Sequence, residues 1–144
     1  NITLVDSLNK RIKFLDEVID KLDLQNIETV HARAEEFGRG VKYREKFDYA
    51  TSRAVANLSI LAEYLIPLVK IKGKVISMKG YTVDEEIENS RKAINVLGGK
   101  ISGIDEFDLP DSDIKRNIII IEKIRNTSNK YPRKAGTPAK DPIR

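Results

Sequence analysis

Strand-like and helix-like segments alternate along most of this 144-residue sequence, and this order restricts the fold more than any other feature. Strands are predicted from apolar and β-branched runs at residues 2–5, 27–31, 47–52 and 74–79. Amphipathic helices are predicted from Ser7 as a cap, over 55–65, and from a capping box of Thr82 and Glu85 to Gly98-Gly99. Helices that alternate with strands indicate a largely parallel sheet covered on both faces.

Two further strands are predicted at residues 100–109 and 117–123, and only a turn around Pro110 separates them. They should therefore be antiparallel. Residues 118–121 are four isoleucines without alternation, which predicts burial on both faces. Residues 38–46 are expected to form a polar loop. An α/β sheet that is mostly parallel and ends in an antiparallel hairpin is typical of Rossmann-like class I AdoMet-dependent methyltransferases, although a fold alone does not define a function.

Basic residues are concentrated at the C-terminal end of the sequence. The net charge is +4, but residues 123–144 contain seven Lys or Arg and one Asp, which leaves the rest of the chain at −2. We therefore divide the chain into a partial methyltransferase domain, 1–125, and a basic tail, 126–144. Pro132 and Pro138 predict an extended, accessible backbone for this tail. It is either a phosphate-contacting arm on an enzyme or an inert solvated end.

Several classes of site receive little support from composition. The sequence has no cysteine, which excludes disulfides and thiolate metal sites, and a reducing cytosol is compatible with this. His31 is the only histidine, so neither a zinc site nor a histidine general base is expected. No apolar run approaches the length of a membrane-spanning helix.

Acidic residues follow the first two predicted strands. The carboxyl ends of strands in open α/β sheets line the ligand crevice, so Asp6 can accept hydrogen bonds from the hydroxyls of a ribose. It can equally cap the following helix. Ala34-Glu35 offers a small residue beside an acidic one, which would suit an adenine ring and its amino group, but a solvated acidic loop also has this composition.

Basic residues follow the next two strands. Arg53 can pair with a ligand carboxylate, with an RNA phosphate, or with a nearby acidic side chain. Lys79-Gly80 either faces the crevice or forms a simple turn, and Glu85-Glu86 looks like a solvated first helical turn.

Four segments together resemble the RsmG (GidB) family of bacterial 16S ribosomal RNA guanine-N7 methyltransferases. They are Leu4-Val5-Asp6-Ser7 with Lys10-Arg11, Ala32-Arg33-Ala34-Glu35, Ser52-Arg53-Ala54-Val55-Ala56, and the tail from Lys130 to Lys140. The resemblance implies methyl transfer from AdoMet to N7 of a guanine in 16S rRNA or the small ribosomal subunit, in the cytoplasm, with no metal and no general base.

The resemblance also assigns roles to residues. Asp6, Ala34, Glu35 and Arg53 would bind the cofactor. Lys130, Arg133, Lys134 and Lys140 would bind the RNA. An unpaired base could stack on Phe37, Tyr43 or Tyr131, each of which could equally serve packing.

One departure from the family is large. The N-terminal helical region, the first strand and the Gly-rich loop of the family have no counterpart here, so we expect a C-terminal portion with an open apolar edge where a central strand is missing. Two alternatives stay open: an RNA-binding fragment without catalysis, and a nicotinamide-dependent oxidoreductase suggested only by the fold and Asp6.

Overall fold

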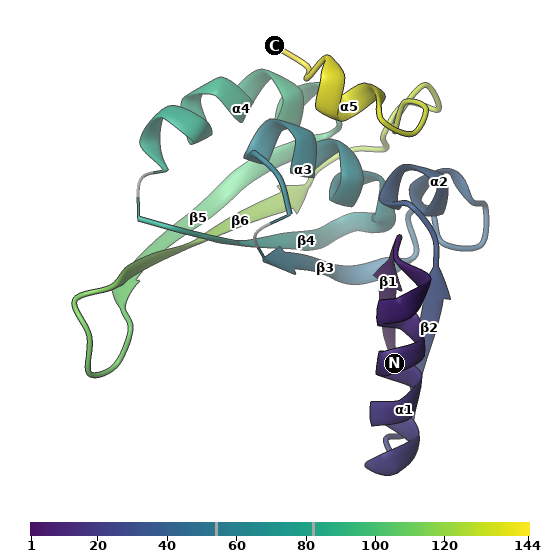
Figure 1. The fold of residues 1–144 in the computed structure, drawn as a ribbon. Helices are drawn as coiled ribbons and strands as arrows, with labels where there is room; N and C mark the ends of the chain where they lie inside the picture. Colours follow the sequence, from purple (N-terminus) through teal and green to yellow (C-terminus); the bar gives the residue numbers. More distant parts are fainter. Residues whose placement is uncertain (54, 82) are drawn as a thin grey trace.

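The computed structural model describes residues 1–53, 55–81 and 83–144 (Figure 1). Thr82, predicted to open a capping box, and Ala54 of the Arg53-Ala54-Val55-Ala56 segment lie outside the described residues. The elements are β1 (Ile2–Asp6), α1 (Asn9–Lys21), β2 (Ile27–His31), α2 (Ala34–Arg39), β3 (Phe47–Arg53), α3 (Leu58–Leu65), η1 (Ile66–Leu68), β4 (Val69–Lys79), α4 (Asp84–Val96), β5 (Gly99–Asp108), β6 (Lys115–Lys123) and α5 (Thr137–Lys140).

The strands form two sheets. β1 and β2 are parallel and make a two-stranded sheet, while the second sheet has the order β3-β4-β6-β5. In the second sheet β3 and β4 are parallel, and β6 is antiparallel to both β4 and β5, which confirms the predicted hairpin. Among the described residues β1 and β3 are both edge strands, so the predicted open edge is present. Its apolar side chains include Ile2 on β1, which is 54% exposed.

Helices cover one face of the four-stranded sheet. Figure 1 shows α3, α4 and α5 on the same side of it, whereas α1 packs against the two-stranded sheet. Ile119 and Ile121 face the helices and are buried, whereas Ile118 and Ile120 are only half-buried. The prediction that this isoleucine run is buried on both faces was therefore wrong. The side chains alternate between a covered and an uncovered face, as they must in any strand.

Local signals explain where α4 ends. Gly98 has a φ of +92°, a left-handed conformation that favours glycine, and its N–H donates to the carbonyl of Asn95 at 3.0 Å. At the start of α1, the expected Ser7 cap did not form: Leu8 occupies the N-cap position, and no side-chain cap hydrogen bond is made there. Gly98 was thus predicted correctly as the end of α4, whereas Ser7 was predicted wrongly as the cap of α1.

The segment predicted as a polar loop, 38–46, begins inside a short helix, α2. Phe37 of this helix is 5% exposed, and its ring centroid lies 4.1 Å from that of Tyr43. Both rings pack near Phe47 at the start of β3. The sequence left base stacking and packing open for Phe37 and Tyr43, and the structure bears out packing for both rings.

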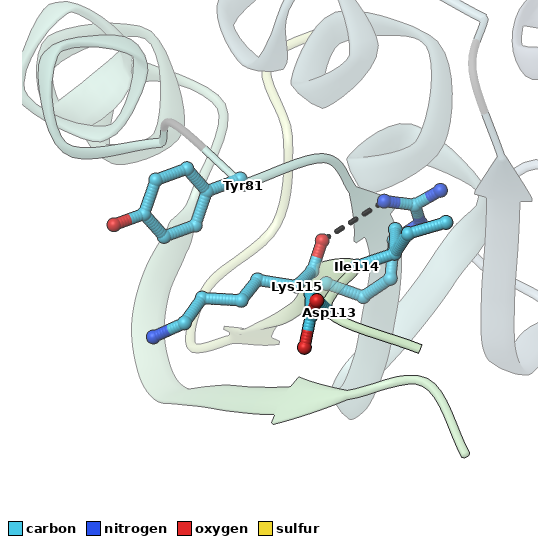
Figure 2. A pocket seen from close by; sticks show the side chains of 5 residues that line it. Tyr81, Asp113, Ile114 and Lys115 are labelled. Atoms are coloured by element: carbon cyan, nitrogen blue, oxygen red, sulfur yellow. Dashed lines mark hydrogen bonds between the residues drawn. The ribbon is translucent and has the colours of Figure 1, made fainter. Parts of the chain in front are cut away.

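The β5–β6 hairpin extends past the carboxyl end of β4 (Figure 1). Together with Tyr81, which follows β4, it lines a hollow of about 380 Å³ (Figure 2). The other lining residues are Asp113, Ile114, Lys115 and Arg116.

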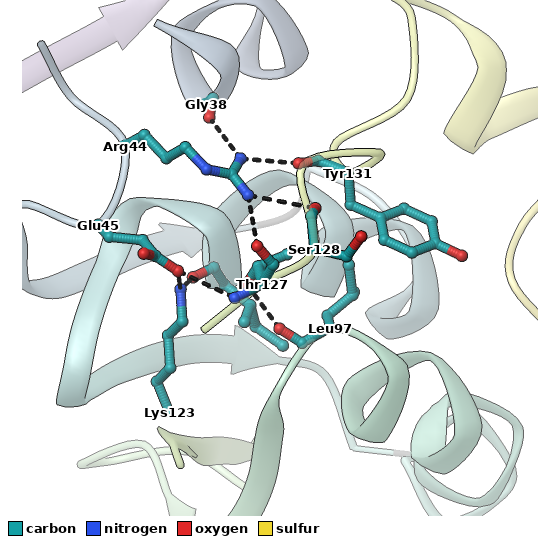
Figure 3. Close-up of polar contacts among 9 residues, drawn as sticks. Gly38, Arg44, Glu45, Leu97, Lys123, Thr127, Ser128 and Tyr131 are labelled. Carbon is teal, nitrogen blue, oxygen red and sulfur yellow. Dashed lines mark hydrogen bonds and ion pairs between the residues drawn. The ribbon is translucent and has the colours of Figure 1, made fainter. Parts of the chain in front are cut away.

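A group of charged residues around the buried Lys123 fixes the start of the C-terminal segment (Figure 3). Lys123, whose side chain is fully buried, donates from Nζ to Glu45 Oε1 at 2.6 Å and to the carbonyl of Ile66 at 3.0 Å. Burial lowers the pKa of the Lys123 ammonium, and the hydrogen bond to Glu45 opposes this effect. The same Glu45 oxygen accepts the backbone N–H of Thr127 at 2.9 Å. The end of β6 is thereby tied to the loop before β3.

Arg44 extends this attachment into the tail. Its guanidinium donates to the carbonyls of Thr127 and Tyr131 at 2.7 Å each. It also reaches the carbonyls of Ser128 at 3.2 Å and Gly38 at 3.3 Å. We call Arg44, Glu45 and Lys123 the clamp; Lys123 is buried, and the other two side chains are half-buried.

Replacing Arg44 with Ala should lower the free energy of unfolding by about 3 kcal/mol, since it leaves several carbonyls without a charged donor. Denaturant unfolding measures this directly. Arg39→Ala, which removes an exposed arginine from the same region, is the matched control and should change stability by less than about 0.5 kcal/mol. Equal effects of the two substitutions would contradict the role given to the clamp.

Candidate functional site

Four residues predicted from the sequence lie at the carboxyl ends of parallel strands. Asp6 and His31 end β1 and β2 and are direct neighbours in the register of the small sheet. Arg53 ends β3 and Lys79 ends β4. This edge is where ligands bind in open α/β sheets.

Asp6 takes part in the start of α1. Its Oδ1 accepts the backbone N–H of Leu8 at 2.8 Å, and its Oδ2 accepts from Arg11 at 3.2 Å. The Leu8 hydrogen bond, followed by Arg11, holds the pKa of the Asp6 carboxyl below its ordinary value. The helix-capping alternative is thus present in the structure. Each oxygen still has a free lone pair, and the side chain is 22% exposed, so the geometry also fits a ribose hydroxyl.

Ala34 and Glu35 form the first turn of α2. Glu35 is 5% exposed, and its Oε1 accepts the N–H of Gly136 from the tail at 2.8 Å. The alternative of a solvated acidic loop is corrected, because this carboxylate is buried and bonded. A cofactor contact by Glu35 remains a prediction and would have to use the other oxygen, Oε2.

Arg53 is exposed at the end of β3. Its guanidinium makes no hydrogen bond or ion pair with the residues that the structure describes, while its backbone pairs with Met78 of β4. A guanidinium at the ligand edge without such a partner is available to an anionic group, and this favours the ligand alternatives over an internal salt bridge.

The loop after Arg53 is anchored from another helix. Lys79 donates from Nζ to the carbonyl of Ala56 and to Glu86 Oε1, both at 2.6 Å. Glu86 Oε1 also accepts the backbone N–H of Leu58, the first residue of α3, at 2.5 Å. Glu86 is therefore a second partner of this loop and not part of a solvated helical turn, which corrects the sequence interpretation. The sequence offered no signal for it, because Glu86 and Leu58 are 28 residues apart.

The tail is folded against the domain instead of extended. Arg133 binds Glu63 of α3 through Nε at 3.0 Å and Nη2 at 2.8 Å, and its backbone N–H donates to the same carboxylate at 2.7 Å. Glu63 is 1% exposed, and its hydrogen bonds raise the pKa of the Arg133 guanidinium. A lone acid within the otherwise apolar segment Leu58–Leu65 is the signal that could have predicted such a partner.

This docking corrects two expectations about the basic tail. Pro132 and Pro138 are buried, and Pro138 lies in the first turn of α5, where proline is tolerated because that N–H needs no helical partner. Arg133 forms an ion pair with Glu63, so unlike the three tail lysines predicted to bind RNA it is half-buried. Lys130, Lys134 and Lys140 are exposed, and Lys130 Nζ lies 5.1 Å from the ring centroid of Tyr131.

Within the described ranges no group of three or more His, Asp or Glu side chains has the geometry of a metal site. The helices that the structure describes are all too short or too polar to cross a membrane.

Solved structures of similar fold define the class. An rRNA methylase from Streptococcus thermophilus matches with a TM-score of 0.60 and 12% identity, covering 85% of this chain and 73% of that protein. A putative methyltransferase from Bacillus halodurans matches with a TM-score of 0.65 and 11% identity, covering 87% of this chain and 84% of that protein. The fold is therefore that of the Rossmann-like class I methyltransferases, as the sequence predicted.

Sequence relatives define the family. The family model described as rRNA small subunit methyltransferase G (GidB) matches residues 1–119. Proteins of that name from Acetivibrio thermocellus and Clostridium novyi are 58% and 51% identical over 99% of this chain. The chain belongs to the GidB family. It spans 58% and 59% of the lengths of those two relatives.

Replacing Glu86 with Ala should loosen the loop after β3, because Leu58 N–H and Lys79 Nζ both lose a charged acceptor. We expect the backbone amide of Leu58 to exchange with deuterium about tenfold faster, measured by mass spectrometry or NMR. Glu85→Ala removes the neighbouring exposed carboxylate and is the control. An unchanged exchange rate of the Leu58 amide would contradict the role of Glu86 in holding this loop.

Proposed function

We propose that the protein containing this chain transfers a methyl group from AdoMet to N7 of a guanine in 16S rRNA. Membership of the GidB family carries the proposal, and the positions of Asp6 and Arg53 at the carboxyl ends of β1 and β3 support it. A cytoplasmic location belongs to the same proposal. The nicotinamide-dependent oxidoreductase has no support from the relatives.

The cofactor would supply an electrophilic methyl group. Asp6 is the residue of this chain that best fits it, since its carboxylate is accessible at the carboxyl edge and can accept from both ribose hydroxyls. Ala34, the first residue of α2, is small enough to lie against a planar ring, and Glu35 has one oxygen left for a donor. These contacts would bind the nucleoside end of AdoMet.

The proposed methyl transfer needs no side chain to act as an acid or a base. Guanine N7 carries an in-plane lone pair and no proton, so its methylation requires no general base. The protein's contribution would be to hold N7 in line with the methyl group and to exclude other geometries. Arg53, whose guanidinium is exposed at the carboxyl end of β3, is suited to fix a phosphate of the target nucleotide or the cofactor carboxylate.

Exposed lysines of the tail would supply the electrostatic part of RNA binding. Lys130, Lys134 and Lys140 are exposed on a segment that is itself docked, so their positions are restricted before RNA arrives. Arg133 contributes indirectly, by holding the tail on Glu63.

Replacing Arg53 with Ala should reduce single-turnover methyl transfer by the whole protein about 100-fold, because the reacting groups lose a fixed contact. The melting temperature should not change, since the side chain is exposed. Arg53→Lys keeps the charge but not the two-pronged geometry, so its rate of methyl transfer should lie between those of the wild type and Arg53→Ala. Wild-type turnover in Arg53→Ala would exclude this role.

Replacing Lys130, Lys134 and Lys140 with Ala should weaken RNA binding and flatten its salt dependence. The slope of log K against log salt concentration should become shallower by about 2, at roughly 0.7 per phosphate contact with single-stranded RNA. A triple substitution of the exposed Lys13, Lys21 and Lys92 changes the net charge equally and is the control. Equal slopes for the two triple variants would leave the tail without a specific role.

AdoMet binding separates catalysis from RNA binding alone. Titration of the whole protein with S-adenosylhomocysteine should give saturable binding. RNA binding without any cofactor binding would favour the non-catalytic alternative.

A further inference from the structure

The hollow beside Tyr81 lies at the same edge of the sheet as the proposed reaction site. Tyr81 follows Lys79 and Gly80 at the carboxyl end of β4, and the hairpin residues 113–116 form the opposite wall (Figure 2). Its volume of about 380 Å³ is open to solvent on one side and is close to what a single nucleotide requires.

The Tyr81 ring is exposed, but its backbone is held in place. Asn117 of β6 is 2% exposed, and its Nδ2 donates to the carbonyls of Gly80 and Tyr81 at 3.0 Å each. The ring itself is 60% exposed. A large aromatic side chain on a backbone fixed by a buried amide loses little freedom when a planar ligand stacks on it.

The polar groups around the ring suit the edge of a nucleobase. Lys115 Nζ lies over one face of the Tyr81 ring, 5.4 Å from its centroid, and donates to Glu106 at 3.0 Å, so a base would stack on the opposite face. Asp113 offers acceptors and Arg116 offers donors within the same lining. A nucleobase presents donors and acceptors around a flat ring, which is the combination that such a lining can bind.

The negative net charge of the hairpin favours a nucleobase over a phosphate as the group bound in the hollow. Between residues 105 and 116 the sequence has five acidic and two basic residues. A polyanionic backbone is not attracted to such a segment, whereas a neutral base is bound by stacking and hydrogen bonds that do not depend on net charge.

We propose that this hollow binds an unpaired nucleobase of the RNA substrate, stacked on Tyr81. The inference rests on the proposed function and adds a recognition site that is separate from the lysines of the tail. It also replaces Phe37 and Tyr43, which are packed in the domain, as the place where a base stacks.

The test measures the affinity of the whole protein for a short single-stranded RNA by fluorescence anisotropy at several salt concentrations. Tyr81→Ala should weaken binding about tenfold at every salt concentration, with an unchanged salt slope, because stacking is not ionic. Tyr81→Phe should bind within about twofold of the wild type, since it keeps the ring. Tyr49→Ala removes another exposed ring, 63% accessible on β3, and should have no effect.

The outcomes separate this inference from the proposed function. If the wild type binds RNA and Tyr81→Ala binds it with the same affinity, the inference alone is overturned. The same holds if Tyr81→Ala changes only the slope of the salt dependence. Equal losses in Tyr81→Ala and Tyr49→Ala overturn it as well. Absence of RNA binding by the wild type overturns both. Melting temperatures of the three variants should match the wild type, which excludes unfolding as the cause.

Discussion

The buried ion pair between Lys123 and Glu45 is the contact on which the arrangement of the C-terminal half depends. An ammonium group inside a protein is costly unless it is paired and hydrogen-bonded, and here both conditions are met by Glu45 and the Ile66 carbonyl. Because Glu45 also accepts from Thr127, the pair fixes the direction in which the chain leaves β6. The tail can then cross the helical layer and meet Glu63 and Glu35.

The basic residues of this molecule therefore divide by task. Lys123, Arg44 and Arg133 are used inside, to satisfy carboxylates and backbone carbonyls, and Lys130, Lys134 and Lys140 remain outside. Arginine is suited to the internal tasks, since its planar group donates in several fixed directions. The proposed reaction edge is organised by the same means, because Lys79 and Glu86 hold the loop that follows Arg53.

The strands and long helices could be predicted from the sequence because each carries its own local pattern, bounded by turn residues such as Gly98. The short helix α2 was missed, since its charged residues and Gly38 resemble a loop and it is stabilised by Phe37 packing on Tyr43. The positions of Asp6 and Arg53 at strand ends were also predictable. Their surroundings were not, because Glu86, Glu63 and Glu35 find partners many residues away. A lone acid in α3 marks Glu63 as paired, but nothing local shows which residue each of the three acids meets.

The hydrogen bond from Gly136 to Glu35 joins the tail to the first turn of α2. A ligand that moves the Glu35 carboxylate must therefore also change the free energy of holding the tail in place. By thermodynamic linkage the effect is reciprocal: whatever factor the cofactor imposes on the affinity for RNA, RNA imposes on the affinity for the cofactor. A single backbone N–H thus couples the position proposed for the cofactor to the segment proposed for RNA, with equal strength in both directions.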